Sequence, residues 1–202
     1  MNRPEFRKTS AIILAGGQGN RFRGKKQFIE IDGRQMWEYP YAEAVSLLGR
    51  DRVKVVGVDV PGGPTRTKSV INGLYSVSAD TSRIVIMEAA RPLVTADDIL
   101  QLLADPGLSA TLVRPVVSTV SFRDGRPLNR DEIYELLSPQ VFDFQLLRAA
   151  LFSGRYHHMT EQTQVMSACY GICPHYVETT SPLFKVTYPQ DVDMVTYLLR
   201  QR

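Results

Sequence analysis

Short apolar runs rich in β-branched residues alternate along this chain with segments of helical apolar spacing, and this alternation limits the possible folds more than any other feature. Strands are expected at residues 10–15, 53–59, 83–89 and 110–117. Helices are expected between them, at residues 36–48, 67–77 and 95–103. Strands and helices alternating at this spacing predict an α/β fold, in which a mostly parallel sheet lies between two layers of helices as a three-layer α/β/α sandwich.

The C-terminal third continues the same pattern. Residues 130–151 have helical apolar spacing on both sides of Pro139, so we expect helix there. Residues 184–188 are expected to form a strand. They lead into a last helix over residues 189–199, which has a proline at its start.

One long polar interruption occurs at residues 121–130. Its Asp124-Gly125 pair predicts a hairpin turn. No internal repeat, low-complexity tract or Pro/Gly linker divides the sequence. We therefore expect a single domain over residues 1–202, with a short arm around residues 118–130.

The composition is that of a soluble globular protein, with 44% apolar and 22% charged residues. No apolar stretch approaches the ~20 residues that a membrane span requires, and the first ten residues lack the apolar core of a signal peptide. We therefore expect a cytoplasmic protein with no membrane partner. The net charge of +3 is too small to indicate a nucleic-acid partner.

The stretch LAGGQGNRFRGKKQF, residues 14–28, directly follows the first apolar run. Its glycines leave backbone amides open to a ligand, and basic side chains stand beside them: Gly16, Gly17 and Gly19, then Arg21, Lys25 and Lys26. Because ligands of open α/β sheets bind beyond the carboxyl ends of the strands, this stretch predicts a polyphosphate site. It is not a Walker A loop, because no G-x4-G-K-[ST] occurs in it. It is not the dinucleotide fingerprint either, because the third glycine of G-x-G-x-x-G is missing.

The same stretch resembles the nucleotide-binding signature of nucleotidyltransferases with the Rossmann-like sugar-nucleotide transferase fold. Further segments resemble the motifs of 2-C-methyl-D-erythritol 4-phosphate cytidylyltransferases in their order along the chain. GGPTRTKSVINGL (62–74) is similar to G-G-x-x-R-x-x-S-V-x-x-G-L, MEAARPLV (87–94) to H-D-A-A-R-P, LLSPQVF (136–142) to L-T-P-Q-x-F, TEQTQVM (160–166) to T-D-x-A-S, and LFKVTYPQDV (183–192) to N-I-K-[IV]-T-x-P-E-D-L. The resemblance implies this fold and an enzyme that transfers a nucleotide from CTP.

The resemblance also implies roles for individual residues. The residues that would bind CTP are Ala15, Gly16, Gly17, Gly19, Gly63, Arg66 and Ser69. The cations that would stabilise charge on the α-phosphorus and the leaving pyrophosphate are Arg21, Lys26 and Lys185. The residues that would hold the acceptor are Arg91, Thr119, Arg130 and Thr160. Glu88 stands at the place of the family's metal-binding aspartate and, as a hard oxygen donor, would hold Mg²⁺.

The expected reaction is in-line attack by an anionic oxygen of the acceptor on the α-phosphorus of CTP. A phosphate or phosphonate oxygen is already deprotonated near neutral pH, so the reaction needs no general base. The enzyme is instead expected to accelerate the reaction by positioning the two substrates and by neutralising the charge on the phosphates. This agrees with a sequence that has no Ser-His-Asp arrangement.

Several departures from the family pattern concern the acceptor. Ser118 replaces an aspartate, Gln164 replaces the serine of T-D-x-A-S, and Leu183 replaces the asparagine of N-I-K, while the arginines are retained. This combination favours a small phosphonate as acceptor. The alternative is a polyol phosphate such as methylerythritol 4-phosphate or ribitol 5-phosphate.

Two further questions stay open at this point. The change to Glu88 is also compatible with a non-catalytic nucleotide-binding module, whereas the missing third glycine argues against a dehydrogenase. The resemblance suggests a homodimer, because the family uses its arm to reach a partner subunit, although the arm of this chain is short.

Overall fold

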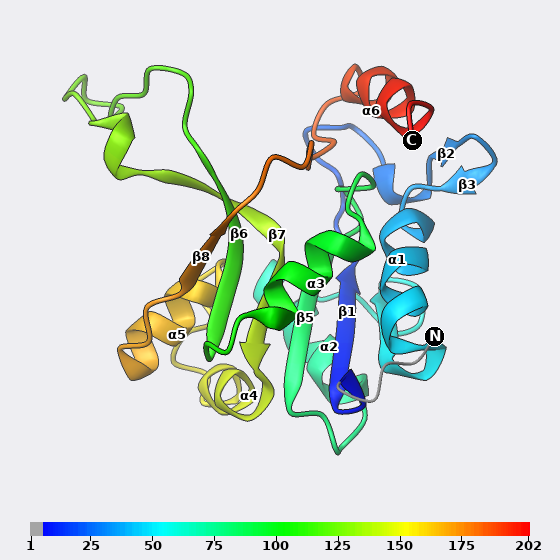
Figure 1. Cartoon of the computed structure of the whole chain (residues 1–202), viewed down its shortest axis with the longest axis vertical. Coiled ribbons are helices and arrows are strands. Elements are labelled where there is room, and N and C mark those ends of the chain that lie inside the picture. The colour runs from blue at the N-terminus through cyan, green and yellow to red at the C-terminus, as the bar shows by residue number, and fades with distance from the viewer. Residues whose placement is uncertain (1–5) are drawn as a thin grey trace.

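The computed structural model describes residues 6–202 and contains a central six-stranded sheet in the order β4-β1-β5-β7-β6-β8 (Figure 1). The strands are β1 (Thr9–Leu14), β4 (Val53–Val56), β5 (Arg83–Glu88), β6 (Ser109–Pro115), β7 (Tyr134–Asp143) and β8 (His175–Glu178). β1 is parallel to β4 and β5, and β6 is parallel to β8. Because only β7 runs in the opposite direction, the carboxyl ends of the other five strands lie at one edge.

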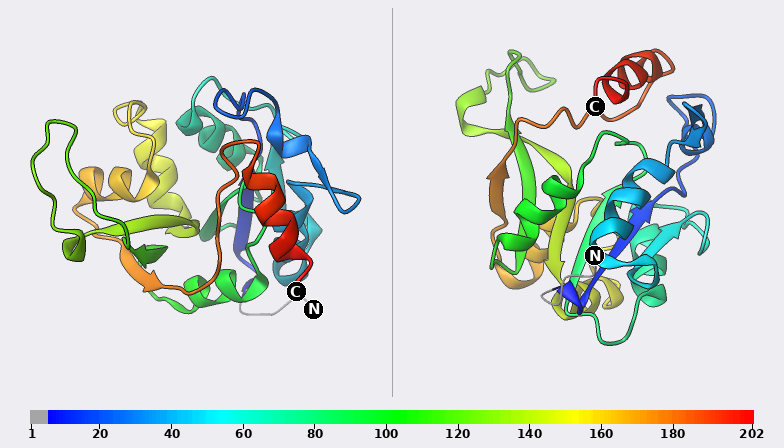
Figure 2. Two further views of the ribbon diagram at one scale, coloured as in Figure 1. Left: turned by 90° about the horizontal axis from the view of Figure 1, so that it is seen from above. Right: turned by 45° about the vertical axis from the view of Figure 1, so that its right-hand side comes forward.

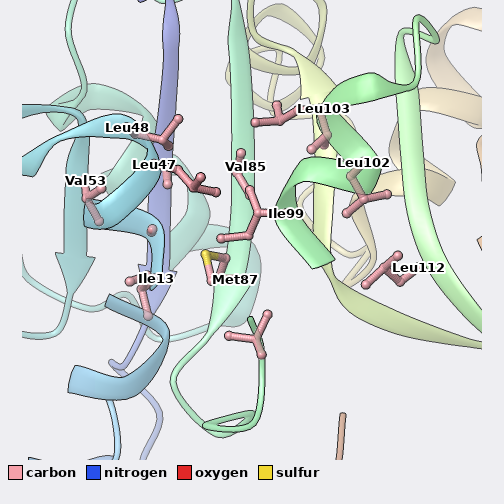
Figure 3. Packing of buried hydrophobic residues seen from close by; sticks show 14 of the residues in the cluster. Ile13, Leu47, Leu48, Val53, Val85, Met87, Ile99, Leu102, Leu103 and Leu112 are labelled. Atoms are coloured by element: carbon pink, nitrogen blue, oxygen red, sulfur yellow. The ribbon is translucent and has the colours of Figure 1, made fainter. Parts of the chain in front are cut away.

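Helices cover both faces of this sheet. They are α1 (Glu38–Leu48) and α3 (Ala96–Ala104) on one face, and α2 (Arg66–Ser76), α4 (Phe144–Phe152) and α5 (Gln162–Tyr170) on the other. Successive strand residues point to opposite faces, so Ile13 packs with Leu47 and Ile99 (Figure 3), whereas Ile12 packs on the other side with Leu74. The expected three-layer α/β/α fold is confirmed. Within residues 6–202, no helix has both the length and the apolar run that a membrane crossing requires.

A smaller apolar cluster lies at the carboxyl-end edge of the sheet. It joins α6 (Asp191–Leu199) to the two-stranded hairpin of β2 (Glu30–Ile31) and β3 (Arg34–Gln35) (Figure 1). Ile31, Leu93, Val186 and Val195 are all buried in it. Burial of Val186 anchors the segment before α6, and the Val186 amide donates to the Ala90 carbonyl at 2.8 Å.

The helix expected over residues 130–151 is wrong for most of its length. Tyr134–Asp143 forms β7, and the helix α4 begins only at Phe144, with the Asp143 carboxylate accepting from the Leu146 amide at 2.9 Å. β7 is hydrogen-bonded to β5 on one side and β6 on the other. Pairing on both sides outweighs the local helical preference of its leucine and glutamate residues.

Pro139 fits this strand because the ladder is irregular beside it. Thr111 of β6 faces Gln140, but Val113 faces Leu136, so the register shifts between these pairs. A proline has no amide hydrogen to give to a neighbouring strand and is tolerated at such irregularities. The irregular ladder therefore lets β7 contain a proline.

The strand expected at residues 184–188 is also wrong, since this segment has no regular structure. The edge strand is instead β8, which pairs with β6. In β8 only Val177 is half-buried and its three other residues are exposed, so it lacks the apolar run that would predict a strand.

Residues 116–133 form an arm between β6 and β7 that projects away from the helices (Figures 1 and 2). Ser121 and Pro127 form an antiparallel bridge across it. The turn between them contains Asp124 and Gly125, and Gly125 has a φ of 85°, which favours glycine. The expected hairpin turn is confirmed.

Candidate active site

The loop that follows β1 and the loop that follows β4 both contain glycines, and the two loops are in contact just beyond the carboxyl ends of these strands. A Cβ added to Gly16 would lie 2.8 Å from the Cα of Gly62, and one added to Gly57 would lie 2.7 Å from the carbonyl carbon of Ala15. Because these neighbours are backbone atoms, no side-chain rotation could relieve the contact. Glycine thus lets the two loops share one wall of the site.

The loop after β1 presents a run of free amides. Within the described part of the chain, no hydrogen bond is made by the backbone N–H groups of residues 16–21. The loop is nevertheless ordered by other bonds, since the Phe22 amide donates to the Gly19 carbonyl at 2.9 Å and the buried Gln27 side chain donates from Nε2 to the Gly17 carbonyl at 3.1 Å. Consecutive free amides beside basic residues form an anion-binding concavity.

A cavity of about 240 Å³ opens at this loop. Its lining includes Gly16, Gly17, Lys26, Gly63, Arg66, Ser69, Glu88 and Lys185. Two neighbouring cavities, of about 350 and 200 Å³, share Gly17 and Gln18 with it, and Arg21 and Gly19 line the larger one. The expected CTP residues and catalytic cations therefore line three adjoining cavities.

The carboxylate of Glu88, at the end of β5, lies among cations. Lys185 Nζ is 2.8 Å from Glu88 Oε2, while Arg66 Nε and Arg91 Nε are each 3.5 Å from one of its oxygens. Burial raises the pKa of Glu88, but the charges of Lys185, Arg66 and Arg91 outweigh burial and lower it from 4.5 to about 2. Glu88 is thus ionised at neutral pH and fixes the positions of three cations.

Lys26 reaches the same cavity from the one-turn helix that follows the loop. Its Nζ donates to the carbonyl of Val186, which ties the loop to the segment before α6. Burial lowers the pKa of Lys26, and the positive charges of Lys185 and Arg21 lower it further, against the opposing effect of Glu88. An anion bound here would relieve this repulsion between cations.

Arg66 is the first residue of α2 and lies at the boundary of two parts of the site. Thr65 caps this helix, with its side chain accepting from the Lys68 amide. Arg66 Nη1 donates to the Thr160 carbonyl at 2.6 Å and to Gln162 Oε1. The segment expected to hold the acceptor therefore contacts the segment expected to hold CTP.

The four expected acceptor residues lie in different places. Arg91 is buried behind Glu88 and donates from Nη1 to the Leu183 carbonyl. Thr160 contacts Arg66 through its carbonyl. Thr119 and Arg130 lie on the exposed arm, where Arg130 donates to the Val117 carbonyl at 2.6 Å. One chain thus brings Arg91 and Thr160 to the cavity region, whereas Thr119 and Arg130 lie on the projecting arm.

Two glutamines in the site were not singled out by the sequence analysis. Gln27 is part of the KKQF segment, but nothing in its spacing indicated a bond to Gly17. Gln162 is fully buried and contacts Arg66, a residue 96 positions away. Gln162 belongs to the TEQTQVM segment, but its neighbours Glu161 and Thr163 are polar, so nothing in the local pattern indicated its burial.

Glu88 is the one protein carboxylate in the lining of the 240 Å³ cavity. Among residues 6–202, no group of three or more His, Cys, Asp or Glu side chains could hold a metal ion. Mg²⁺ is commonly bound by one or two carboxylates together with substrate phosphates. Glu88 therefore fits Mg²⁺ as a single protein ligand that acts together with a bound nucleotide.

Comparison with known proteins identifies the family. The sequence model of 2-C-methyl-D-erythritol 4-phosphate cytidylyltransferase matches residues 38–201. The protein of that name from Dechloromonas aromatica (strain RCB) is 31% identical over 225 residues, which cover 95% of this chain and 97% of that protein. The chain belongs to this family. A CTP-dependent nucleotidyltransferase is therefore confirmed as the enzyme class, and the family relationship favours an enzyme over a non-catalytic module.

Other relatives agree. The protein of the same name from Haemophilus influenzae (strain PittGG) is 28% identical, with 96% of this chain and 97% of that protein covered. The crystal structure of the Thermus thermophilus enzyme superposes with a TM-score of 0.77 at 26% identity, covering 95% of this chain and 98% of that one. The crystal structure from Anaerococcus prevotii, with a TM-score of 0.77 at 20% identity over 96% and 98% of the two chains, supports the fold. The family model and the Dechloromonas, Haemophilus and Thermus proteins are all named for 2-C-methyl-D-erythritol 4-phosphate, so the comparisons favour the polyol-phosphate alternative over a phosphonate.

Proposed function

We propose that this enzyme transfers CMP from CTP to 2-C-methyl-D-erythritol 4-phosphate or a closely similar polyol phosphate and releases pyrophosphate. The observation that carries the proposal is the run of free amides at residues 16–21 beside a cavity that is lined by Lys26, Lys185 and Arg66. Free amides and cations together suit a triphosphate. The choice of acceptor rests on the name that the family model and the relatives share, 2-C-methyl-D-erythritol 4-phosphate cytidylyltransferase.

In the proposed reaction the amides of the loop bind the phosphates of CTP. A phosphate oxygen of the acceptor attacks the α-phosphorus, a new P–O bond forms, and the bond to the β-phosphate breaks so that pyrophosphate leaves. Lys26, Lys185 and Arg21 neutralise the charge on the α-phosphorus and the leaving group. The oxygen of the attacking phosphate is already ionised, so none of these residues has to remove a proton.

Mg²⁺ is proposed as the metal cofactor, with Glu88 as its protein ligand. When bound, it would supply additional positive charge to the phosphates. Lys185 pairs with both Glu88 oxygens, at 3.0 and 2.8 Å. Phosphate oxygens would give Lys185 another anionic partner and so weaken its hold on Glu88, whose remaining cationic neighbours, Arg66 and Arg91, are both 3.5 Å away.

A homodimer is proposed as the working assembly. Thr119 and Arg130 match acceptor-contacting positions of the family yet lie on the projecting arm. An arm that reached a partner subunit would bring them to the partner's cavity. The cytoplasmic location remains a prediction from the sequence.

The test is release of pyrophosphate from CTP and Mg²⁺ in the presence of 2-C-methyl-D-erythritol 4-phosphate, ribitol 5-phosphate or a small phosphonate. We expect release with the methylerythritol phosphate and CTP, and none when ATP, GTP or UTP replaces CTP. Lys185→Met should lower kcat by about 100-fold or more, the size of effect typical for loss of one transition-state charge partner. Lys8→Met is the matched control, because Lys8 is exposed just before β1 at the opposite edge of the sheet.

The outcomes separate the substrates. Release with the phosphonate and none with either polyol phosphate would contradict the proposed acceptor. Equal loss in Lys185→Met and Lys8→Met would contradict the proposed role of Lys185. CTP binding without turnover of any of the three acceptors would also overturn the proposal.

A further inference from the structure

The guanidinium of Arg66 is held from three directions. Both hydrogens of Nη1 are directed to the acceptor-side segment, one to the Thr160 carbonyl at 2.6 Å and one to Gln162 Oε1. Nε faces Glu88 Oε1 at 3.5 Å. An arginine has five N–H donors, so the two on Nη2 remain. Within residues 6–202 no protein acceptor meets them, and Arg66 lines the 240 Å³ cavity.

The Gln162 side chain is buried, and its oxygen accepts a hydrogen bond from Arg66. It is the first residue of α5 and is fully buried. An arginine can only donate hydrogen bonds, so the amide must present its oxygen to Arg66. The Nε2 atom of Gln162 is buried and has no hydrogen-bond partner in the part of the chain that the structure describes, so Arg66 is the polar contact of this side chain.

A second bond joins the same two segments without involving Arg66. Thr67, the next residue of α2, is fully buried and donates from Oγ1 to the Met159 carbonyl. Thr67 therefore tethers the acceptor-side segment to α2, as Gln162 does, but its hydroxyl bonds to the Met159 carbonyl and not to the Arg66 side chain. The Thr67–Met159 bond only joins the two segments, whereas the Gln162–Arg66 bond also orients the arginine, so variants of Thr67 and Gln162 distinguish the two roles.

We propose that Gln162 is a positioning residue: its side-chain oxygen fixes Arg66 so that Nη2 points to the phosphates of bound nucleotide, which couples the acceptor-side segment to the CTP site. This inference rests on the proposed function for the identity of the nucleotide. A guanidinium fixed in advance loses less conformational entropy when it binds phosphate. Removal of the Gln162 oxygen would leave Arg66 with only its Thr160 and Glu88 contacts and so widen the range of orientations open to Nη2.

The test measures both the Kd for CTP with Mg²⁺ in the absence of any acceptor, and kcat/KM for pyrophosphate release. Gln162→Met keeps the length and removes the oxygen, and should weaken CTP binding and lower kcat/KM by about tenfold. Gln162→Glu keeps an acceptor oxygen and should stay within about threefold of the wild type. Thr67→Val, the matched control for the tether, should also stay within about threefold. These expected sizes follow from loss of one preorganised charge-assisted contact.

A double-mutant cycle with Arg66→Met decides the mechanism. If Gln162 acts through Arg66, the double variant Arg66→Met/Gln162→Met binds CTP no worse than Arg66→Met alone. Additive losses in the double variant, or equal losses in Gln162→Met and Thr67→Val, would overturn the inference. Thermal unfolding of each variant identifies any that fail to fold, and Gln162→Asn, which withdraws the oxygen by one methylene, then replaces Gln162→Met. Because CTP binding is measured without acceptor, failure of the proposed acceptor leaves this test intact.

Discussion

Glu88 shows how one carboxylate can organise a strongly cationic site. It pairs with Lys185 at 2.8 Å and lies 3.5 Å from both Arg66 and Arg91, and its side chain is only 13% exposed. Without it, three cations would face one another at the end of β5. The same pairing that prepares the cavity for a polyphosphate also stabilises the folded chain.

The first prediction concerns this pairing and pH. The folded-state pKa of Glu88 is lowered from 4.5 to about 2, so its contribution to stability is present above pH 4.5 and is lost as the pH falls toward 2. At about 1.4 kcal/mol per pKa unit, the contribution is about 3 kcal/mol. Glu88→Gln should lower the free energy of unfolding by about this amount at pH 7, and the difference from the wild type should shrink between pH 4.5 and 2. Urea unfolding in metal-free buffer at pH 7, 4.5 and 3 measures it.

Glu30→Gln is the control for this prediction, because Glu30 is an exposed carboxylate on β2. It should unfold like the wild type at every pH. A Glu88→Gln difference that is absent at pH 7, or that stays constant down to pH 3, would contradict the electrostatic role of Glu88.

At the scale of elements, the contact between the loops after β1 and β4 sets the shape of the site. Gly62→Ala would place a Cβ 2.9 Å from the Cα of Gly16, a backbone atom that can yield only if the loops separate. We expect CTP binding to weaken at least tenfold, with a stability loss of about 1–3 kcal/mol from overpacking. Gly24→Ala is the matched control, because a Cβ there meets no atom within 4 Å. Calorimetric titration with CTP measures the effect, and equal affinity in the two variants would rule out the close approach as a determinant of the site.

The alternating pattern predicted β1, α1, β4, α2, β5, α3 and β6 because each buries a run or face of apolar residues in its own sequence, whereas the short hairpin of β2 and β3 was not predicted. β7 could not be predicted in this way. Its leucines and its one glutamate favour helix locally, and its strand conformation depends on pairing with β5 and β6, which are distant in the sequence. The segment at residues 184–188 failed for the opposite reason: Val186 is buried against α6 rather than in the sheet, so its apolar character does not indicate a strand.

The residues of the candidate site also differ in whether the sequence alone could reveal them. The glycine loop and the lysines could be found because their residues are adjacent in sequence or stand in recognisable motifs. The Arg66–Gln162 contact spans 96 positions and joins the starts of two helices, which only the fold brings together. Motif positions assigned Arg66 to the nucleotide, but its bonds to the acceptor-side segment follow from the packing of α5 beside α2 and α4.

At the scale of the whole molecule, the projecting arm predicts a homodimer. Val117 is 79% and Phe122 43% exposed on it, apolar surface that a partner subunit would cover, and it also bears Thr119 and Arg130. We expect light scattering after size-exclusion chromatography to give twice the chain mass of 22.7 kDa.

Replacing residues 118–130 by a short Gly-Ser turn should give the mass of one chain and abolish turnover of the acceptor. The Kd for CTP should change less than about threefold, because the nucleotide cavity lies on the body of the chain. Asp124→Asn, which keeps the arm, is the control. A shortened variant that retains the wild-type mass and turnover would mean that the arm neither joins two subunits nor supplies acceptor contacts.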